Sequence, residues 1–171
     1  MIRRRLLSFL VAAFSATCGA CGAVPHADRP ARVEAMATEY ESEWPGVPQI
    51  SAATFIATPD NQRPLLVDCR APAERAVSML PKAITPDQIE ANPDAFQETP
   101  LIVYCTIGYR STKLASQLRK RGFNASNLHA GVLGWAHAQQ AFVTPDGHTT
   151  THVHVYGATW DLLPQGYESE Y

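Results

Sequence analysis

The sequence predicts an α/β fold in which a central parallel sheet carries helices on both faces. Two short apolar runs, 65–68 and 101–104, have the length and composition of buried strands. Segments with helical character follow at 86–91 and 112–121, and Gly122 ends the second of them. Strands that alternate with helices favour parallel pairing, with the helices packed on both sides of the sheet.

The first 23 residues are predicted to be a signal peptide. Three arginines at positions 3–5 precede an apolar stretch over 6–16, which is too short to span a bilayer. Cleavage is expected after a small residue near the end of this segment. Alternatively, Cys21 becomes the lipid-bearing end of a lipoprotein and tethers the chain to a membrane. Either route predicts export to the periplasm or the cell envelope.

Length and composition limit the remaining possibilities. A chain of 171 residues with 46% hydrophobic and 18% charged residues fits one globular domain with appendages. Without the three signal arginines, 11 of the 14 basic residues remain against 16 acidic ones, a formal charge near −5. This acidic balance argues against nucleic acid as a partner.

Residues 24–47 are predicted to form an N-terminal helical arm. Four apolar residues lie at helical spacing over 32–44, with acidic residues on the remaining surface. The apolar set is Val33, Met36, Tyr40 and Trp44, and the acidic set is Glu34, Glu39, Glu41 and Glu43. We expect this helix to pack on the main domain, which spans 48–140.

Within the main domain, the strand pattern begins at Gln49-Ile50. Ser51 is a predicted cap for a short helix. An irregular turn is expected from the strand 65–68 to Pro72, and Ile84 marks a further short strand.

The segment between the strand 101–104 and the helix that follows it carries the chemical signal. It reads Cys105, Thr106, Ile107, Gly108, Tyr109, Arg110 and Ser111. A cysteine at a strand end, before a glycine loop that opens a helix, favours a thiolate, because amides and the helix N-terminus stabilise its charge. Arg110 adds a fixed cation, and the same loop would hold an anion.

This loop resembles the six-residue C-x-x-G-x-R loop of the rhodanese sulfurtransferases. Two further blocks match that family: Asp68, Arg70 and Glu74 after the strand 65–68, and the segment 127–135 with Gly131, Gly134 and Trp135. The related cysteine-dependent phosphatases have one more residue between cysteine and arginine. There are two departures: Ala130 replaces a usual glycine, and the segment 77–84 lacks the usual Gly-His-Ile opening.

The resemblance implies a rhodanese-like sheet and sulfur transfer without a metal or organic cofactor. Cys105 would take a sulfane sulfur from thiosulfate or from an organic or protein persulfide, and a thiol or another nucleophile would accept it. Loop amides over 106–111 would stabilise the persulfide, and Arg110 would bond loop carbonyls or a neighbouring acid. Asp68 and Arg70 are expected to support the loop or form a structural ion pair, and Glu74 to pair with a base.

Alternative functions stay open at this point. The loop could hold a persulfide or an anion for a partner without turnover, or act as a redox sensor. A phosphatase or an arsenate reductase is disfavoured by the short loop. Arg110 is the loop's one cation, so an organic donor competes with the thiosulfate dianion.

Cys69 follows the strand 65–68 and has two interpretations. It is a small buried residue, or it lies close enough to Cys105 to form a reversible disulfide that resolves or protects an oxidised Cys105. The second holds if the strands 65–68 and 101–104 are neighbours, as the resemblance implies.

Residues 141–171 are predicted to add a β-hairpin extension with a Pro-Asp-Gly turn over 145–147. The second strand, 149–156, would place His152, His154 and Tyr156 on one face. Together with His148, these histidines could bind zinc or copper, but a solvated polar face is preferred because no cysteine or carboxylate lies at ligand spacing. Trp160, Leu162, Leu163 and Tyr167 are predicted to pack the tail onto the domain.

Overall fold

The protein is described by a computed structural model covering residues 23–171. Residues 1–22 of the predicted signal peptide, which include Cys21, therefore lie outside this range. The helices are α1 (Arg29–Glu41), α2 (Ala52–Ala57), α3 (Pro72–Val77), α4 (Pro86–Ala91), α5 (Tyr109–Lys120) and α6 (Gly131–His137). Four short 3-10 turns are η1 (His26–Asp28), η2 (Asp60–Gln62), η3 (Pro93–Phe96) and η4 (Ala158–Trp160). The strands are β1 (Gln49–Ile50), β2 (Leu65–Asp68), β3 (Leu101–Tyr104), β4 (Ala125–Leu128), β5 (Phe142–Val143), β6 (Thr149–Thr150), β7 (His152–His154) and β8 (Glu168–Glu170).

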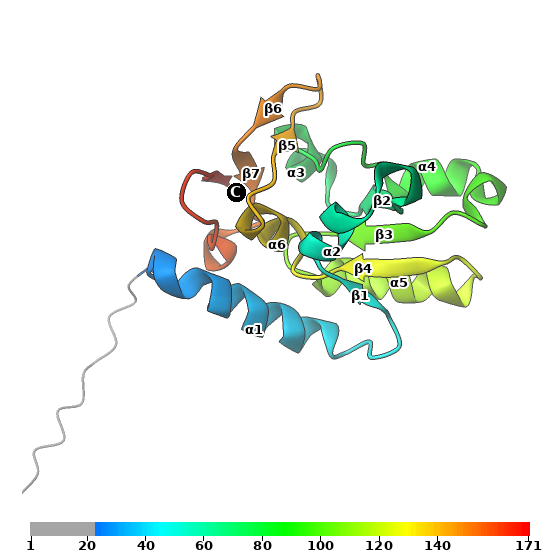
Figure 1. Ribbon diagram of the computed structural model, residues 1–171, viewed down its shortest axis with the longest axis horizontal. Coiled ribbons are helices and arrows are strands. Elements are labelled where there is room, and N and C mark those ends of the chain that lie inside the picture. The colour runs from blue at the N-terminus through cyan, green and yellow to red at the C-terminus, as the bar shows by residue number, and fades with distance from the viewer. Residues whose placement is uncertain (1–22) are drawn as a thin grey trace, which may run out of the picture.

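A four-stranded parallel sheet in the order β1-β4-β3-β2 forms the centre of the molecule (Figure 1). Leu66 pairs with Ile102, and Val67 pairs with Val103. Alternate side chains of a strand point to opposite faces, so the first pair joins one core and the second pair joins another. The predicted fold class is confirmed.

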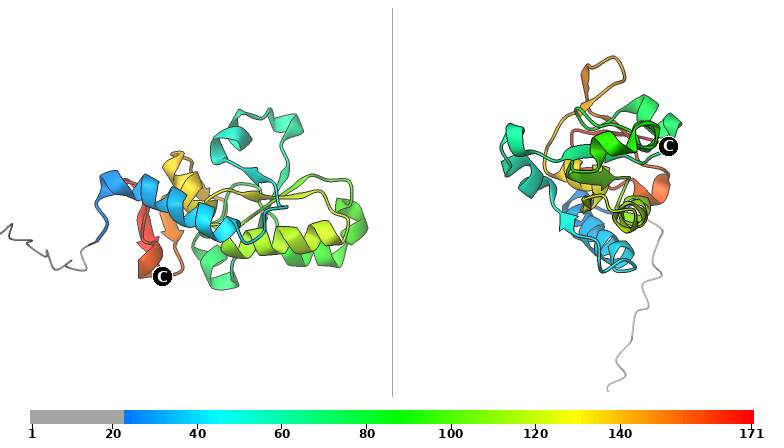
Figure 2. Two further views of the ribbon diagram at one scale, coloured as in Figure 1. Left: turned by 90° about the horizontal axis from the view of Figure 1, so that it is seen from below. Right: turned by 90° about the vertical axis from the view of Figure 1, so that its right-hand side faces the viewer.

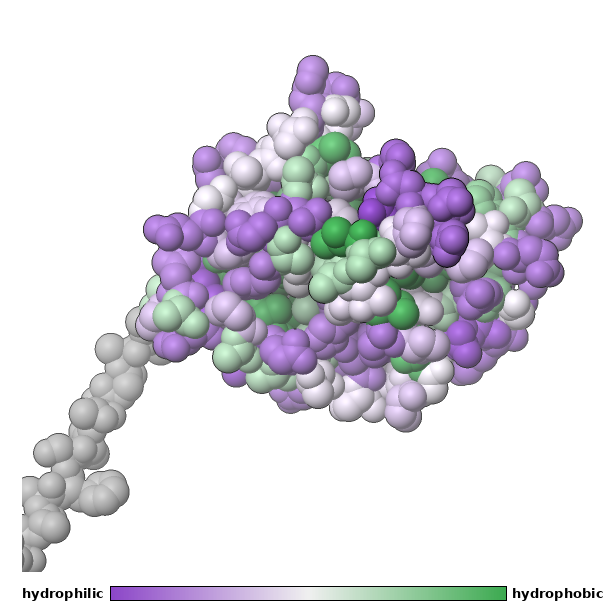
Figure 3. Space-filling view, in the orientation of Figure 1, coloured by the Kyte–Doolittle hydropathy of each residue, from purple (hydrophilic) through white to green (hydrophobic). Residues whose placement is uncertain are grey.

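Helices cover both faces of this sheet. α2 and α6 contribute to the core that contains Ile102, whereas α4 and α5 contribute to the core that contains Val103. Figure 2 shows α2 and α5 on opposite sides of the sheet. Figure 3 shows one outer face, which is mostly polar with small apolar patches, as expected for a chain that encloses its apolar side chains.

Several local predictions are confirmed. Ser51 caps α2 by accepting a hydrogen bond from Thr54 N at 3.0 Å. α4 has the predicted range, and the predicted strand at Ile84 is a single bridge to Val67. The turn that follows β2 ends at Pro72, where α3 begins. α5 starts at Tyr109, three residues earlier than expected, so its N-terminus lies within the Cys105 loop.

The N-terminal arm is part of the core. α1 is shifted toward the N-terminus relative to the predicted range 32–44, and Pro30 occupies its first turn. Val33 and Met36 are buried, as predicted, in the core beneath α6. Trp44 follows the helix and packs against the second core.

The tail forms a shorter hairpin than predicted. β5 and β6 pair antiparallel around the turn. The prediction of one strand over 149–156 is wrong. The strand breaks at Thr151, and the part that follows, β7, pairs in parallel with β8. The break lets Val153 and Val155 enter the main core, while His152 stays exposed. Leu162 and Leu163 are buried there too, which confirms that the tail packs on the domain.

Within residues 23–171, each helix is too short or too polar to cross a lipid bilayer.

Candidate active site

Cys105 lies at the carboxyl end of β3, where the chain turns into α5. Its Sγ accepts hydrogen bonds from Gly108 N at 3.2 Å and from Ser111 Oγ at 3.3 Å. Gly108 has a φ of 117°, which a side chain would strain, so glycine is needed for the loop to present its amide to the sulfur. The predicted amide donor is present at this sulfur, and the Ser111 hydroxyl is a further donor that the sequence analysis did not name.

The pKa of Cys105 lies well below that of an ordinary thiol. Burial alone would raise it, but hydrogen bonds from Cys69 and Ser111, together with the charge of Arg110, outweigh burial. The site therefore favours the thiolate, which is the nucleophilic form of cysteine.

Arg110 forms a two-pronged ion pair with Glu74. Its Nη1 lies 2.6 Å from Oε2 and its Nη2 lies 2.8 Å from Oε1, and Nη2 also donates to Thr106 Oγ1 at 3.0 Å. Burial would raise the pKa of Glu74, but bonds from Arg110 and from Ala71 N lower it overall. The structure thus contains the expected pairing of Arg110 with an acid and of Glu74 with a base.

Asp68 and Arg70 form a structural ion pair below the loop. Both side chains are fully buried, and Arg70 Nη2 lies 2.8 Å from Asp68 Oδ2. The carboxylate also accepts a bond from Tyr104 Oη at 2.7 Å, and Arg70 donates to Ser78 O at 2.6 Å. The pair joins β2, β3 and the segment after α3. It is therefore a structural ion pair, which was one of the two roles predicted for these residues.

Cys69 continues β2 beside Cys105. Both its backbone N and its Sγ donate to Tyr104 O, each at 3.1 Å, so the two cysteines follow a paired row of adjacent parallel strands. Both cysteines are free thiols. The neighbouring Cys105 sulfur and burial raise the pKa of Cys69. Cys105 is therefore the thiolate of the pair, and Cys69 stays protonated.

The turn into α6 supports the loop from behind. Val132 N and Leu133 N donate to Cys105 O and Thr106 O at 2.9 and 3.2 Å. A Cβ on Gly131 would lie 2.2 Å from Cys105 O, so the close approach excludes every larger residue. Ala130, which replaces a usual glycine, has a φ of 57° and thus adopts the left-handed conformation despite its side chain.

Glu41 is a supporting residue that the sequence interpretation placed on the solvent surface, and that interpretation is wrong. Glu41 is 6% exposed and accepts hydrogen bonds from Asn127 Nδ2 at 2.9 Å and from Ala130 N at 3.2 Å. Its other oxygen lies 2.6 Å from His129 Nδ1. A Cβ on Gly108 would lie 2.6 Å from Glu41 Oε1, so the arm touches the active-site loop directly.

A cavity of about 360 Å³ opens above Cys105. Four loop residues line it, and so do three aromatic side chains from outside the main domain. The loop residues are Thr106, Ile107, Tyr109 and Arg110, and the added residues are Tyr40 from α1 and Tyr156 and Trp160 from the tail. Helical spacing marked Tyr40 as a core residue, and nothing in the sequence connected Tyr156 or Trp160 with Cys105.

The tail histidines do not converge on one point. Across residues 23–171, no group of three or more histidine, cysteine or acidic side chains has the arrangement of a metal site. His152 instead lies beside Glu168 and Glu170, and His148 lies beside Asp146.

Comparisons with known proteins agree on one family. The Rhodanese-like domain matches residues 51–138. A protein named "Sulfurtransferase" from Allochromatium vinosum is 34% identical over 95 residues, which cover 52% of this chain and 86% of that protein. A thiosulfate sulfurtransferase structure from Pseudomonas aeruginosa aligns with a TM-score of 0.53 at 24% identity, covering 68% of this chain but only 23% of that one. The BH2092 protein from Bacillus halodurans aligns with a TM-score of 0.51 at 19% identity, over 67% of this chain and 87% of its own. The chain belongs to the rhodanese-like domain family.

Proposed function

We propose that the protein is a sulfurtransferase that carries sulfur as a persulfide on Cys105. The observation that carries this proposal is the environment of Sγ: an amide and a hydroxyl donate to it, and Arg110 is held nearby, so the pKa of the thiol is lowered. Membership of the family supports the same chemistry.

The reaction has two steps. In the first, the Cys105 thiolate attacks the sulfane sulfur of a donor, and the rest of the donor leaves with the bonding electron pair. In the second, an acceptor thiolate or cyanide attacks the outer persulfide sulfur and releases the thiolate again. Gly108 N and Ser111 Oγ stabilise the negative Cys105 sulfur before the first step and again after the second. These two steps need no cofactor.

Arg110 has a positioning role in this proposal. Two of its nitrogen atoms are bound to Glu74, so most of its hydrogen-bonding capacity fixes the loop. Its charge still acts on the sulfur, which lies in the same buried site.

Intact-mass spectrometry tests the intermediate. The reduced Cys69→Ser protein, in which the neighbouring thiol cannot react with an adduct, is incubated with thiosulfate or glutathione persulfide, beside a Cys105→Ser variant. We expect Cys69→Ser to gain the mass of one sulfur, Cys105→Ser to gain none, and cyanide to remove the adduct. Absence of an adduct with both donors would refute the proposal.

Turnover separates an enzyme from a persulfide carrier. Cys105 is 1% exposed, which favours a protected carrier as the second candidate function. A sulfurtransferase produces many equivalents of thiocyanate from donor and cyanide. A carrier passes on about one equivalent and then stops until a partner protein is supplied.

A further inference from the structure

We propose that the cavity above Cys105 binds a sulfur donor with an aromatic or apolar organic body and at most one negative charge. This inference deepens the proposed sulfurtransferase function and rests on it. The chain segments outside the family match, residues 23–50 and 139–171, would then determine donor specificity.

The walls of the cavity carry the first part of the argument. Tyr156 packs edge-on against Trp160 with ring centroids 5.2 Å apart, and Tyr40 packs edge-on against Tyr109 at 5.9 Å. Tyr109 and Tyr156 remain 41% and 57% exposed, so their rings are available to contact a ligand in the cavity that they line. Figure 1 shows the tail at the carboxyl ends of the strands, the end at which β3 leads into Cys105.

The backbone of Tyr156 adds an independent sign of function. Its φ is 73°, in the left-handed region that a residue with a bulky side chain rarely adopts. The strained turn directs the ring over the Arg110 guanidinium, with 4.9 Å between the ring centroid and Cζ. Strain of this kind persists where the surrounding structure or a functional requirement maintains it.

Charge disfavours the thiosulfate dianion. Of the residues that line the cavity, Cys105 as thiolate and Arg110 are charged, and Arg110 is already neutralised by Glu74. Together, Cys105, Arg110 and Glu74 therefore have a net charge of about −1. This charge repels a donor with two negative charges more strongly than a donor with one. An organic body instead gains stacking and apolar contact with the walls.

Three donors that leave comparable products test this inference: thiosulfate, methanethiosulfonate and benzenethiosulfonate, each with cyanide as the acceptor. We expect kcat/KM for the benzene compound to exceed that for the methane compound by about tenfold, since only the benzene ring can stack against the aromatic walls. In Tyr156→Ala, which removes an aromatic wall of the cavity, this ratio should fall severalfold. Tyr171→Ala, which removes an exposed aromatic residue that does not line the cavity, should leave it unchanged.

Equal kcat/KM for the two thiosulfonates, or a preference for thiosulfate, would overturn the inference. Binding of benzenesulfinate to the Cys105→Ser protein is then measured by tryptophan fluorescence. This measurement separates failure of the cavity inference from failure of the proposed function. Saturable binding that weakens in Tyr156→Ala supports the cavity even without turnover. No binding by the folded protein rejects it.

A second inference follows from the cysteine pair. We propose that Cys69 resolves the Cys105 persulfide and releases sulfide. Neighbouring strands lie about 4.8 Å apart, within the Cα separation that a disulfide requires. Cys69 and Cys105 directly follow the paired residues Asp68 and Tyr104 of such strands.

The reaction balances without an external oxidant. The Cys69 sulfur attacks Cys105 Sγ, the bond to the outer sulfur breaks, and that sulfur leaves as sulfide with the Cys69 proton. The two cysteine sulfurs are oxidised to a disulfide while the sulfane sulfur is reduced. A thiol reductant must then restore the pair for another cycle.

Quantifying sulfide after one donor addition without acceptor tests this step. We expect wild type to release about one equivalent and to carry a Cys69–Cys105 disulfide in peptide maps, whereas Cys69→Ser retains a persulfide and releases none. A wild-type persulfide that persists beside a free Cys69 would overturn the inference. Diamide treatment provides an arm independent of sulfur transfer: failure to form this disulfide would also reject it.

Discussion

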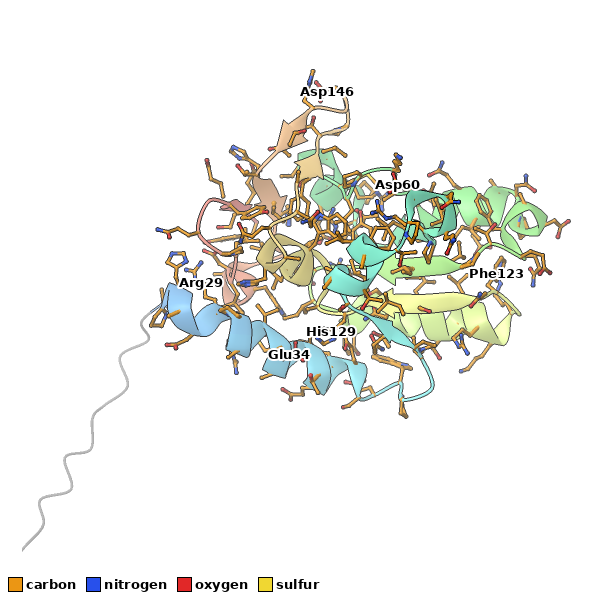
Figure 4. All side chains as sticks on the ribbon, in the orientation of Figure 1. Arg29, Glu34, Asp60, Phe123, His129 and Asp146 are labelled. Carbon is orange, nitrogen blue, oxygen red and sulfur yellow. The ribbon has the colours of Figure 1, made fainter. Side chains whose placement is uncertain are left out.

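Deprotonation of His129 should make the fold less stable at alkaline pH. Its ring lies between two carboxylates, with Nδ1 2.6 Å from Glu41 Oε2 and Nε2 2.8 Å from Glu34 Oε2 (Figure 4). The bond to Glu41 raises the pKa of His129 most, burial opposes it, and Glu34 adds to it, giving a value of about 9 instead of 6.5.

The magnitude follows from this shift. A rise of roughly 2.5 pKa units corresponds to about 3 kcal/mol at 1.36 kcal/mol per unit. Since Glu34 is 66% exposed, solvent screening reduces its share, and we expect about 2 kcal/mol. Because the folded pKa is raised, the stabilisation is complete below pH 6.5 and is lost as the pH rises from 6.5 through about 9.

Urea unfolding of wild type and His129→Gln measures the effect. Between about pH 6 and pH 9.5, the wild type should lose about 2 kcal/mol more unfolding free energy than the variant. Titration of Cys105 is common to both proteins and cancels in the difference. His148→Gln, a change at an exposed histidine, is the matched control. Equal pH dependence in wild type and His129→Gln would refute the ion-pair argument.

Three further changes test the supporting contacts. Arg70→Met should destabilise the fold by about 3–5 kcal/mol in urea because it leaves Asp68 buried and unpaired, and adding Asp68→Leu should recover most of the loss; a single-variant cost under about 1 kcal/mol would contradict this. Gly131→Ala should lower the urea midpoint of unfolding and abolish persulfide formation, because the added Cβ would lie 2.2 Å from Cys105 O. An active, fully stable variant would contradict this close approach. Ser111→Ala should raise the pKa of Cys105, seen as a shift of the pH profile of iodoacetamide alkylation toward alkaline pH, since the variant loses the 3.3 Å bond to Sγ.

Local sequence determined two central strands and the nucleophile loop, whereas β4, which lies between β1 and β3, was not predicted as a strand. The runs 65–68 and 101–104 form β2 and β3 with the predicted ends, because short apolar runs bounded by turn signals are typical of buried strands. The spacing from Cys105 to Arg110 was enough to predict a thiolate site, since amides and the start of a helix act over a few residues. The family followed from this loop together with the blocks at 68–74 and 127–135, and the resemblance also implied that Arg110 bonds loop carbonyls or a neighbouring acid.

Only the tertiary structure decided what surrounds that loop. Glu41 has the pattern of an exposed helix residue, yet packing places its carboxylate against Asn127 and Ala130, far away in the sequence. Tyr156 was predicted to continue a strand, but the burial of Val155 and the turn at Tyr156 bring its ring over Arg110 instead. Periodicity reports which face of an element is apolar, whereas the partner of that face depends on contacts between distant segments. The sequence by itself therefore determined strands β2 and β3 and the cysteine–arginine loop, and the folded chain decided the place of β4 in the sheet and which aromatic side chains enclose the sulfur.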